Sequence, residues 1–298
     1  MKLDREKKGD AYILLGAVIW GFFPIITTLT FATLSPLTSL GWSTLFAAVF
    51  FAVLLTARKK WPEIRKKEAL KDILMTTLLL SVVYYFFYYF GLKFTSPGNV
   101  SLIALTEIFF SFIFFQLWRK VDFPPAHIFG ALLMLSGAGI VLYPNFSSFH
   151  SGDFLILAAC FIAPFGNFFQ QRARKNAGSE AILFVRSLFG AILIFALAAA
   201  LGENVFALDL SKSFLFLLVN GFIMFGFSKI IWIEGIHRIS VTKANALSAI
   251  TPLLTLLFVW MIFHNAPTAF QLLAFVPMFF GVFLLGKGKK AEKLELEV

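Results

Sequence analysis

A carboxyl group lies deep inside an apolar stretch of this chain. Glu107 stands about ten residues from either end of the run 97–118, so its side chain cannot reach water along a helix that rises about 1.5 Å per residue. Apolar surroundings favour the neutral acid and a neighbouring cation favours the carboxylate. Such a group can exchange a proton for a cationic substrate. The alternative is a protonated glutamate that holds helices together, with Thr106 or Ser111 as partner; we favour the functional interpretation because ionisable groups at this depth are usually functional.

A lysine lies in another apolar run. Lys229 is about seven residues from the end of the run 213–236, a distance of roughly 10 Å that a lysine can partly bridge toward water. If it faces the interior, it can pair with Glu107 or hold the carboxylate of a substrate. We expect Arg186, early in the run 180–201, to reach the headgroup region instead.

Four tyrosines follow helical spacing in the run 72–92. Tyr84 and Tyr88 form one i, i+4 pair, and Tyr85 and Tyr89 form another, so each pair shares a helix face. They can form an aromatic wall that stacks on a ring or attracts an ammonium group. An interfacial aromatic belt is an equally good interpretation, because Tyr89 lies near the end of the run.

Amide and hydroxyl groups interrupt two further runs. Asn167 lies in the run 153–171, and Asn245 and Ser248 share one predicted face in the run 240–263. They can line a cavity or bond helix to helix. The sequence contains no metal-ligand spacing, no nucleophile elbow and no Gly-rich nucleotide loop. We therefore expect no metal, no cofactor and no enzymatic activity.

The composition shows which elements must position these side chains. Of 298 residues, 59% are hydrophobic and 14% charged, and the mean hydropathy is +0.84, which excludes a soluble globular protein. The net charge of +10 does not indicate nucleic-acid binding, because the basic residues stand between apolar runs. These runs predict ten membrane-spanning helices in a lipid bilayer: 11–32, 36–57, 72–92, 97–118, 124–143, 153–171, 180–201, 213–236, 240–263 and 267–286.

The distribution of Lys and Arg gives the predicted orientation. With ten spans and a cytoplasmic N-terminus, 22 of the 26 basic residues fall on the cytoplasmic side, and only Lys93 and Lys212 fall on the other. This is a strong positive-inside bias, and one span more or fewer would remove it. We therefore predict an all-α integral membrane protein of the inner membrane with both termini in the cytoplasm.

The two halves of the chain repeat each other weakly. Gly91 and Ser96, between the third and fourth spans, stand 144 residues before Gly235 and Ser240, between the eighth and ninth. A unit of five spans is odd, so a second copy must enter the membrane from the opposite side. The prediction is two inverted five-helix repeats, 1–143 and 144–286, followed by a cytoplasmic tail, 287–298.

At these residues the sequence resembles the drug/metabolite transporter superfamily, and within it the EamA-type proteins. The resemblance rests on the motifs Gly16-Ala-Val-Ile-Trp20-Gly21, Tyr89-Phe-Gly-Leu-Lys-Phe-Thr95-Ser96, Gly152-Asp153, the stretch from Arg238 through Ala246 to Pro252, and Gly281-Val-Phe-Leu-Leu-Gly286. The family commonly has proline where this chain has Glu107, and Glu-Pro where it has Thr251-Pro252. The resemblance implies ten helices and a small-molecule substrate.

We therefore expect a secondary transporter that works by alternating access as a monomer or weak dimer, with export favoured and protons as a candidate coupling ion. The substrate would be a small amphoteric or cationic metabolite, such as an amino acid. The alternatives are an importer or exchanger of a nucleoside-like or sulfonium compound and, less favoured, a membrane enzyme or a receptor. The candidate binding and coupling residues are Glu107, Lys229, Tyr84, Tyr85, Tyr88, Trp20, Asn167, Asn245 and Ser248.

Overall fold

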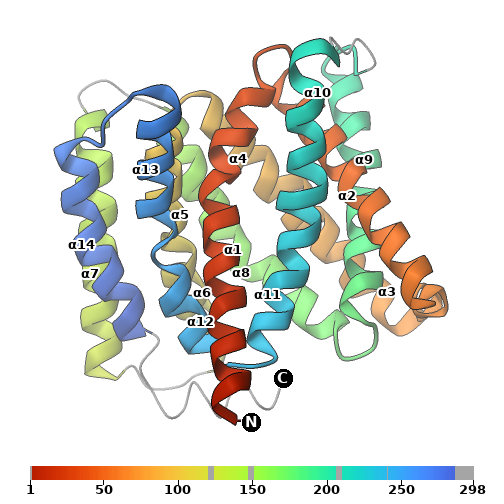
Figure 1. Cartoon of the computed structure of the whole chain (residues 1–298), viewed down its shortest axis with the longest axis horizontal. Helices are drawn as coiled ribbons and strands as arrows, with labels where there is room; N and C mark the ends of the chain where they lie inside the picture. Colours follow the sequence, from red (N-terminus) through yellow and green to blue (C-terminus); the bar gives the residue numbers. More distant parts are fainter. Residues whose placement is uncertain (1, 120–123, 147–150, 206–209, 240, 286–298) are drawn as a thin grey trace.

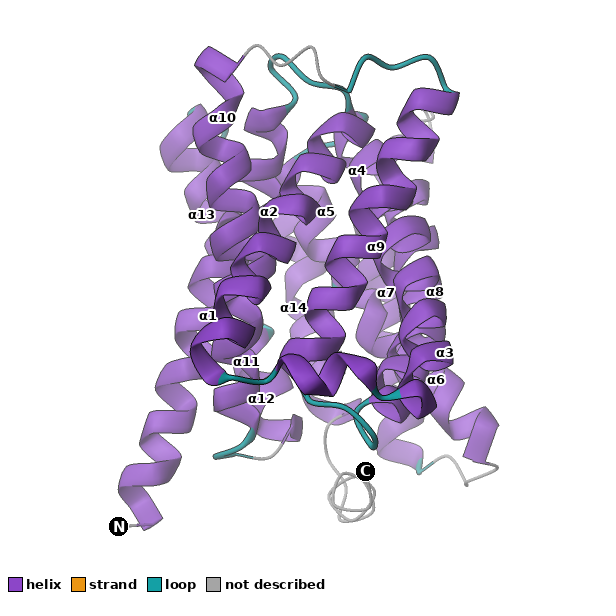
Figure 2. Ribbon diagram, turned by 90° about the vertical axis from the view of Figure 1, so that its right-hand side faces the viewer, coloured by secondary structure: helices purple, strands orange, loops and turns teal. Residues whose placement is uncertain are grey.

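The computed structural model describes residues 2–119, 124–146, 151–205, 210–239 and 241–285, and every regular element in this part of the chain is helical (Figure 1). Ser240 and the predicted tail 287–298 lie outside the described residues. The helices stand side by side as one bundle, seen from a second side in Figure 2. We call the face at which α1 begins the lower face, as both views draw it, and the opposite one the upper face.

The α-helices follow the apolar runs, except that α1 begins at Lys2, nine residues before the predicted start at 11, so the charged N-terminal segment is helical as well. Their bounds are α1 Lys2–Thr30, α2 Pro36–Arg58, α3 Lys67–Thr76, α4 Tyr84–Lys93, α5 Pro97–Ala104, α6 Thr106–Arg119, α7 Pro125–Phe146, α8 Ser151–Ala173, α9 Ser179–Ala200, α10 Leu210–Leu218, α11 Ser228–Ile236, α12 Val241–Ser248, α13 Thr251–Phe263 and α14 Ala269–Leu285. A short 3₁₀-helix covers Trp61–Arg65, and two π-helical segments join α3 to α4 and α10 to α11, at Thr77–Val83 and Val219–Phe227.

Within the described residues, nine helical runs are long and apolar enough to cross a membrane, and α14 is a shorter apolar helix. Local signals set several of their ends. Ser35 and Ser96 accept hydrogen bonds from the backbone N–H three residues later, and a proline follows each of them at the first helical position. The apolar runs therefore become helices where the sequence predicts them, with serine caps at the upper face.

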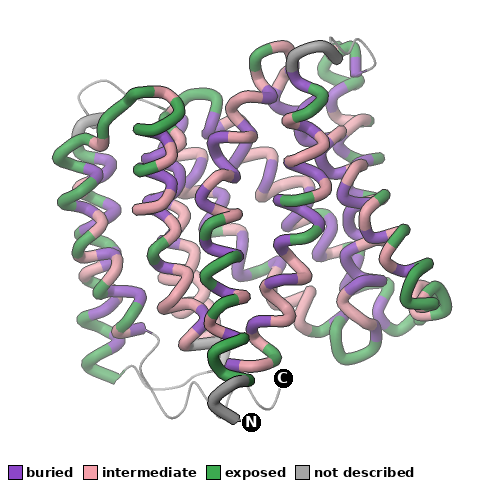
Figure 3. The backbone as a smooth tube through the Cα atoms, viewed as in Figure 1, coloured by how far each residue is buried: buried purple, intermediate pink, exposed green. Residues whose placement is uncertain are grey.

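The outside of the bundle is apolar. Val53, Leu215 and Met261 expose 62%, 66% and 65% of their surface, whereas large side chains such as Phe51 and Tyr89 are fully buried between the helices. Figure 3 shows the exposed positions along the outward sides of the helices and the buried ones along the inward sides. Large exposed side chains are in contact with lipid in such a protein, so the inward sides carry its specific chemistry.

Two of the long runs are broken in the middle, at related places. The α5–α6 run breaks at Leu105 and the α12–α13 run at Ala249, 144 residues later. Each break is bridged by a threonine hydroxyl that donates to the carbonyl three residues earlier, Thr106 to Ile103 and Thr251 to Ser248, both at 2.6 Å. Broken helices at membrane depth occur where backbone groups are satisfied inside the protein or line a cavity.

Contacts between the two halves are reciprocal. A Cβ atom on Gly281 would lie 2.7 Å from Met134 Cγ, and one on Gly137 would overlap Met278 Cγ. Both members of the second pair are related to the first by 144 residues. Gly91 approaches Ile156 and Gly235 approaches Ile13 in the same way. The run α3–α4 rises from the lower to the upper face, while α10–α11 descends (Figures 1 and 2).

We predict that Gly137→Leu destabilises the protein, because α7 and α14 approach each other too closely there for a larger side chain; Ala274 O would lie 2.9 Å from the added Cβ. Overpacking of this kind costs about 1–3 kcal/mol. Gly139→Leu is the matched control, because a Cβ at Gly139 meets nothing within 4 Å. Thermal unfolding in detergent should show a lower Tm for the first variant only, and equal losses would contradict the packing.

Candidate functional site

Glu107 lies in the first turn of α6, directly after the break at Leu105. Its Oε1 accepts a hydrogen bond from Asn167 Nδ2 of α8 at 3.3 Å, and its Oε2 accepts one from the Tyr84 hydroxyl of α4 at 3.5 Å. The structure thus brings together three of the residues singled out in the sequence, from three helices. Thr106 and Ser111 are not its partners.

Lys229 lies in the first turn of α11, and its side chain is directed at an aromatic ring rather than at an acid. Its Nζ is 4.3 Å from the ring centroid of Trp20 on α1, a cation–π contact. No carboxylate of the described residues forms an ion pair with it, so Lys229 and Glu107 are not in direct contact. Their charges are nonetheless close enough to interact.

Arg186 does not lie where the sequence predicts it. We expected it to reach the headgroups, but only 9% of its surface is exposed. Its Nε donates to Ser81 Oγ at 2.9 Å, and its Nη1 donates to Gln170 Oε1 at 2.7 Å. Its charge interacts with those of Glu107 and Lys229. Distance along the helix could not reveal this, because Arg186 is about as far from its helix end as Lys229; the rotation of α9 decides where the side chain lies.

The tyrosines of α4 line the same interior. Tyr85, Tyr88 and Tyr89 expose 7%, 4% and 0% of their surface, so they do not form an interfacial belt. The rings of Tyr84 and Tyr88 stack with centroids 5.9 Å apart, and Tyr85 packs against Phe225 at 4.8 Å. These rings form a wall on one side of the charged residues.

We call Glu107, Arg186 and Lys229 the charged centre. Two predicted site residues, Asn245 and Ser248, form no hydrogen bond with these described residues. Both lie on α12 and are half-buried, but no hydrogen bond joins either side chain to the described residues. The described residues contain no group of three His, Cys, Asp or Glu side chains placed to hold a metal ion.

The upper part of the interior is closed by a neutral hydrogen-bonded cluster. Asn220 Nδ2 donates to Thr27 Oγ1 and Ser43 Oγ, each at 3.2 Å, and to the Tyr89 hydroxyl at 2.9 Å. None of the four residues exposes any surface. Four helical runs therefore meet above the charged centre through fully buried side chains.

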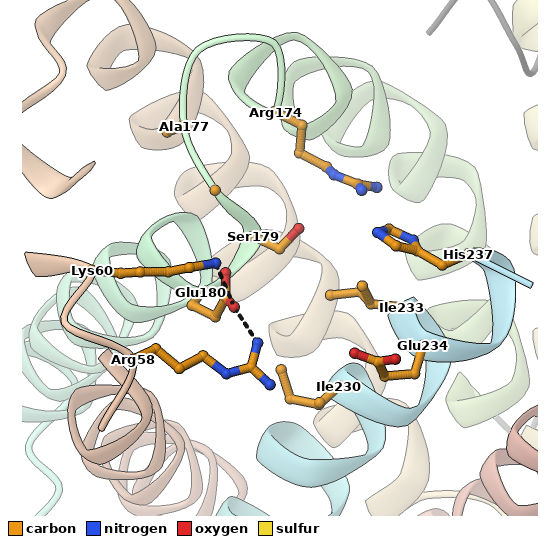
Figure 4. Close-up of a pocket in the computed structure, with 11 residues that line it drawn as sticks. Arg58, Lys60, Arg174, Ala177, Ser179, Glu180, Ile230, Ile233, Glu234 and His237 are labelled. Carbon is orange, nitrogen blue, oxygen red and sulfur yellow. Dashed lines mark hydrogen bonds and ion pairs between the residues drawn. The ribbon is translucent and has the colours of Figure 1, made fainter. Parts of the chain in front are cut away.

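A pocket of about 300 Å³ lies at the lower face instead. Figure 4 shows Arg58 and Lys60 directed at Glu180 on one side of it, at 2.6 and 3.0 Å, and Glu234 and His237 on the other. Ser179, in its lining, is two helical turns below Arg186 on α9, and Ile230 follows Lys229 directly on α11. The pocket therefore lies below the charged centre, between α9 and α11.

Comparison with known proteins identifies related chains. Residues 7–143 and 150–287 each match the model of the EamA-like transporter family. The chain is 23% identical to YoaV, an uncharacterized transporter of Bacillus subtilis, over 91% of this chain and 96% of that one. It is also 23% identical to sll1164, an uncharacterized transporter of Synechocystis sp., over 65% of this chain but only 58% of that protein's length. A solved crystal structure of a protein 19% identical shares the fold, with a TM-score of 0.71, covering 98% of this chain and 100% of that one.

We predict that Asn220→Leu lowers the free energy of unfolding by about 1–2 kcal/mol, because three buried hydroxyl groups lose their shared donor. Asn245→Leu is the matched control, since the Asn245 side chain has no partner among the described residues, and its effect should be small. Thermal unfolding in detergent measures both. An unchanged Tm for Asn220→Leu would contradict the role of the cluster.

Proposed function

The chain belongs to the EamA-like transporter family, and from this premise we propose that it is a secondary active transporter that exports a small amphoteric or cationic metabolite by alternating access. The family makes it a multi-pass membrane protein, in agreement with the long apolar helices. The observation that carries the proposal is Glu107, a carboxyl group held by Asn167 and Tyr84 at a helix break in the middle of the bundle. An ionisable group at that depth favours a substrate or coupling-ion site.

We propose ten spans with both termini in the cytoplasm, so that the lower face is the cytoplasmic one. The positive-inside bias of the sequence supports this orientation. The tenth span is α14, whose 17 described residues reach about 25 Å, slightly less than the apolar core of about 30 Å. With this orientation, the N-terminal end of α1, the 58–67 connection and the end of α8 lie in the cytoplasm.

We further propose that residues 1–143 and 144–286 are inverted repeats. Several observations support this: both halves match the same family model, the breaks at Leu105 and Ala249 are 144 residues apart, and the contacts Gly137–Met278 and Gly281–Met134 are reciprocal. Related helices also run in opposite directions, as α3–α4 and α10–α11 do. Two inverted repeats give a molecule two nearly equivalent shapes, open to either side in turn.

Substrate and proton would compete for the charged centre in this mechanism. An ammonium group of the substrate would replace the proton on Glu107, the tyrosine wall would contact the apolar part, and Trp20 and Lys229 would close the opposite side. The pocket at the lower face supports loading from the cytoplasm, and the closed cluster around Asn220 supports a sealed upper face in this state. Export follows when the upper cluster opens and the lower pocket closes.

The proposed topology predicts opposite labelling of two single-cysteine variants in a Cys160→Ala background. Asn265→Cys, in the exposed α13–α14 connection, should react with a membrane-impermeant maleimide in intact cells. Lys175→Cys, in the exposed α8–α9 connection, should react only after the cells are lysed. The reverse pattern, or labelling of both in intact cells, would contradict the topology.

Glu107→Gln should abolish transport or its dependence on a proton gradient, because the amide keeps the size of the side chain but cannot carry the proton. The measurement is uptake and efflux of candidate metabolites by proteoliposomes with and without a pH gradient. Glu68→Gln, at an exposed position of α3, is the matched control and should behave as wild type. Unchanged, gradient-dependent transport by Glu107→Gln would overturn the assignment.

A further inference from the structure

Arg186 is a buried cation whose hydrogen-bond partners are neutral. It is nine-tenths buried, and the acceptors of its two hydrogen bonds are Ser81 Oγ and Gln170 Oε1. No carboxylate of the described residues lies within ion-pair distance of the guanidinium. Burial of a charge is unfavourable unless an opposite charge compensates it, so this side chain favours an anion that comes from elsewhere.

Lys229 adds a second positive charge without a paired acid. Its ammonium group rests on the Trp20 ring at 4.3 Å, and its charge interacts with that of Arg186. Two like charges close together in an apolar interior repel each other, because little water screens them. An anion placed between the two would remove this repulsion and gain an attraction to both.

The negative charge of Glu107 does not neutralise the two positive charges of Arg186 and Lys229. Its oxygens already accept hydrogen bonds from Asn167 and Tyr84, and it forms no ion pair with either cation. Even when Glu107 is ionised, the three side chains leave one positive charge in excess. The carboxylate of a ligand placed at the two cations weakens their repulsion, whereas a simple organic cation adds a further positive charge.

The first half of the chain indicates that packing does not require an arginine here. Thr27 and Ser43 stand 143 residues before Gln170 and Arg186, the spacing that also relates Ile13 to Ile156 in the reciprocal contacts. In the first half, the corresponding positions hold only the small hydroxyl side chains of Thr27 and Ser43, which both accept hydrogen bonds from Asn220. The arginine therefore adds a charge at a position where serine can serve the architecture.

Helix α8 carries the amide partners of both Glu107 and Arg186. Asn167 and Gln170 are three residues apart on α8 and share a face; the first amide donates to Glu107 and the second accepts from Arg186. The two amides lie about one turn apart along α8, at roughly 4.5 Å of helical rise, so the acid and the guanidinium are anchored to neighbouring positions of the same helix face. This arrangement is complementary to a ligand that has an amine at one end and a carboxylate at the other.

We propose that Arg186, with Lys229 beside it, binds the carboxylate of the substrate. This inference rests on the proposed transport function and narrows its substrate class: amphoteric acids with an amine and a carboxylate are substrates, and organic cations that lack a carboxylate are not. The planar fork of a guanidinium matches both oxygens of a carboxylate.

The test uses proteoliposomes of the full chain loaded with three compound classes on the same carbon skeletons. Common amino acids carry both groups, their carboxamides keep only the amine, and their N-acetyl derivatives keep only the carboxylate. Mass spectrometry follows the release of each compound. Wild type should release at least one amino acid ~10-fold or more faster than its carboxamide, as expected for loss of a charge-assisted contact.

Arg186→Gln should remove this preference, because the neutral amide can still bond to Ser81 and Gln170 but cannot attract a carboxylate. Arg186→Lys keeps the charge without the fork and should retain the preference at a lower rate. Arg65→Gln, at an exposed position of the 3₁₀-helix Trp61–Arg65, is the matched control and should equal wild type. If Arg186→Gln does not fold, as judged by its Tm, Lys229→Gln replaces it with the same expected loss of preference.

A wrong carboxylate site and a wrong transport function would give different results in this test. Wild-type vesicles that release carboxamides as fast as amino acids, or a folded Arg186→Gln that keeps the preference, would overturn the carboxylate site while transport itself stands. Wild-type vesicles that release none of the compounds would contradict the proposed transport function, and the inference would fall with it.

Discussion

Ionisable groups inside a lipid-embedded bundle are unfavourable unless polar partners surround them, and the helices of this protein are arranged around that constraint. Glu107, Arg186 and Lys229 lie where helices break or where side chains of other helices approach: an amide and a phenol reach Glu107, an amide and a hydroxyl reach Arg186, and an indole ring receives Lys229. Apolar side chains cover the outside. The three ionisable groups of the centre therefore each have a polar or aromatic partner from another helix.

The two halves provide the same framework but fill it differently. In the upper part, Asn220 bonds to three neutral hydroxyl groups, among them those of Thr27 and Ser43. In the second half, the positions that correspond to Thr27 and Ser43 hold the amide of Gln170 and the cation of Arg186. In the proposed mechanism, a symmetric framework allows two alternating shapes, and its asymmetric filling lets one side bind while the other seals. Arg186 stands where the first half has Ser43, and in this mechanism that difference gives the transporter its preference for a carboxylate.

Most of the fold could be predicted from the sequence, because apolar runs bounded by charges, prolines and serine caps determine where helices begin and end. Glu107 could be singled out as well, since a carboxyl group in the middle of such a run is unfavourable in lipid and must face the protein interior. The environment of Arg186 could not be predicted: its distance from the helix end is compatible with the headgroups, and only the rotation of α9 against α8 places it inside. For the same reason, a shared face for Asn245 and Ser248 did not indicate which neighbours they would have.

An experimental density map of the protein with a transported compound bound would show directly which end of the compound faces Arg186 and which end faces Glu107. We expect the compound between α4, α8, α9 and α11, with its carboxylate against Arg186 and Lys229 and its amine against Glu107. A compound bound with the opposite polarity, or at the lower pocket alone with the charged centre unchanged, would contradict the proposed mechanism.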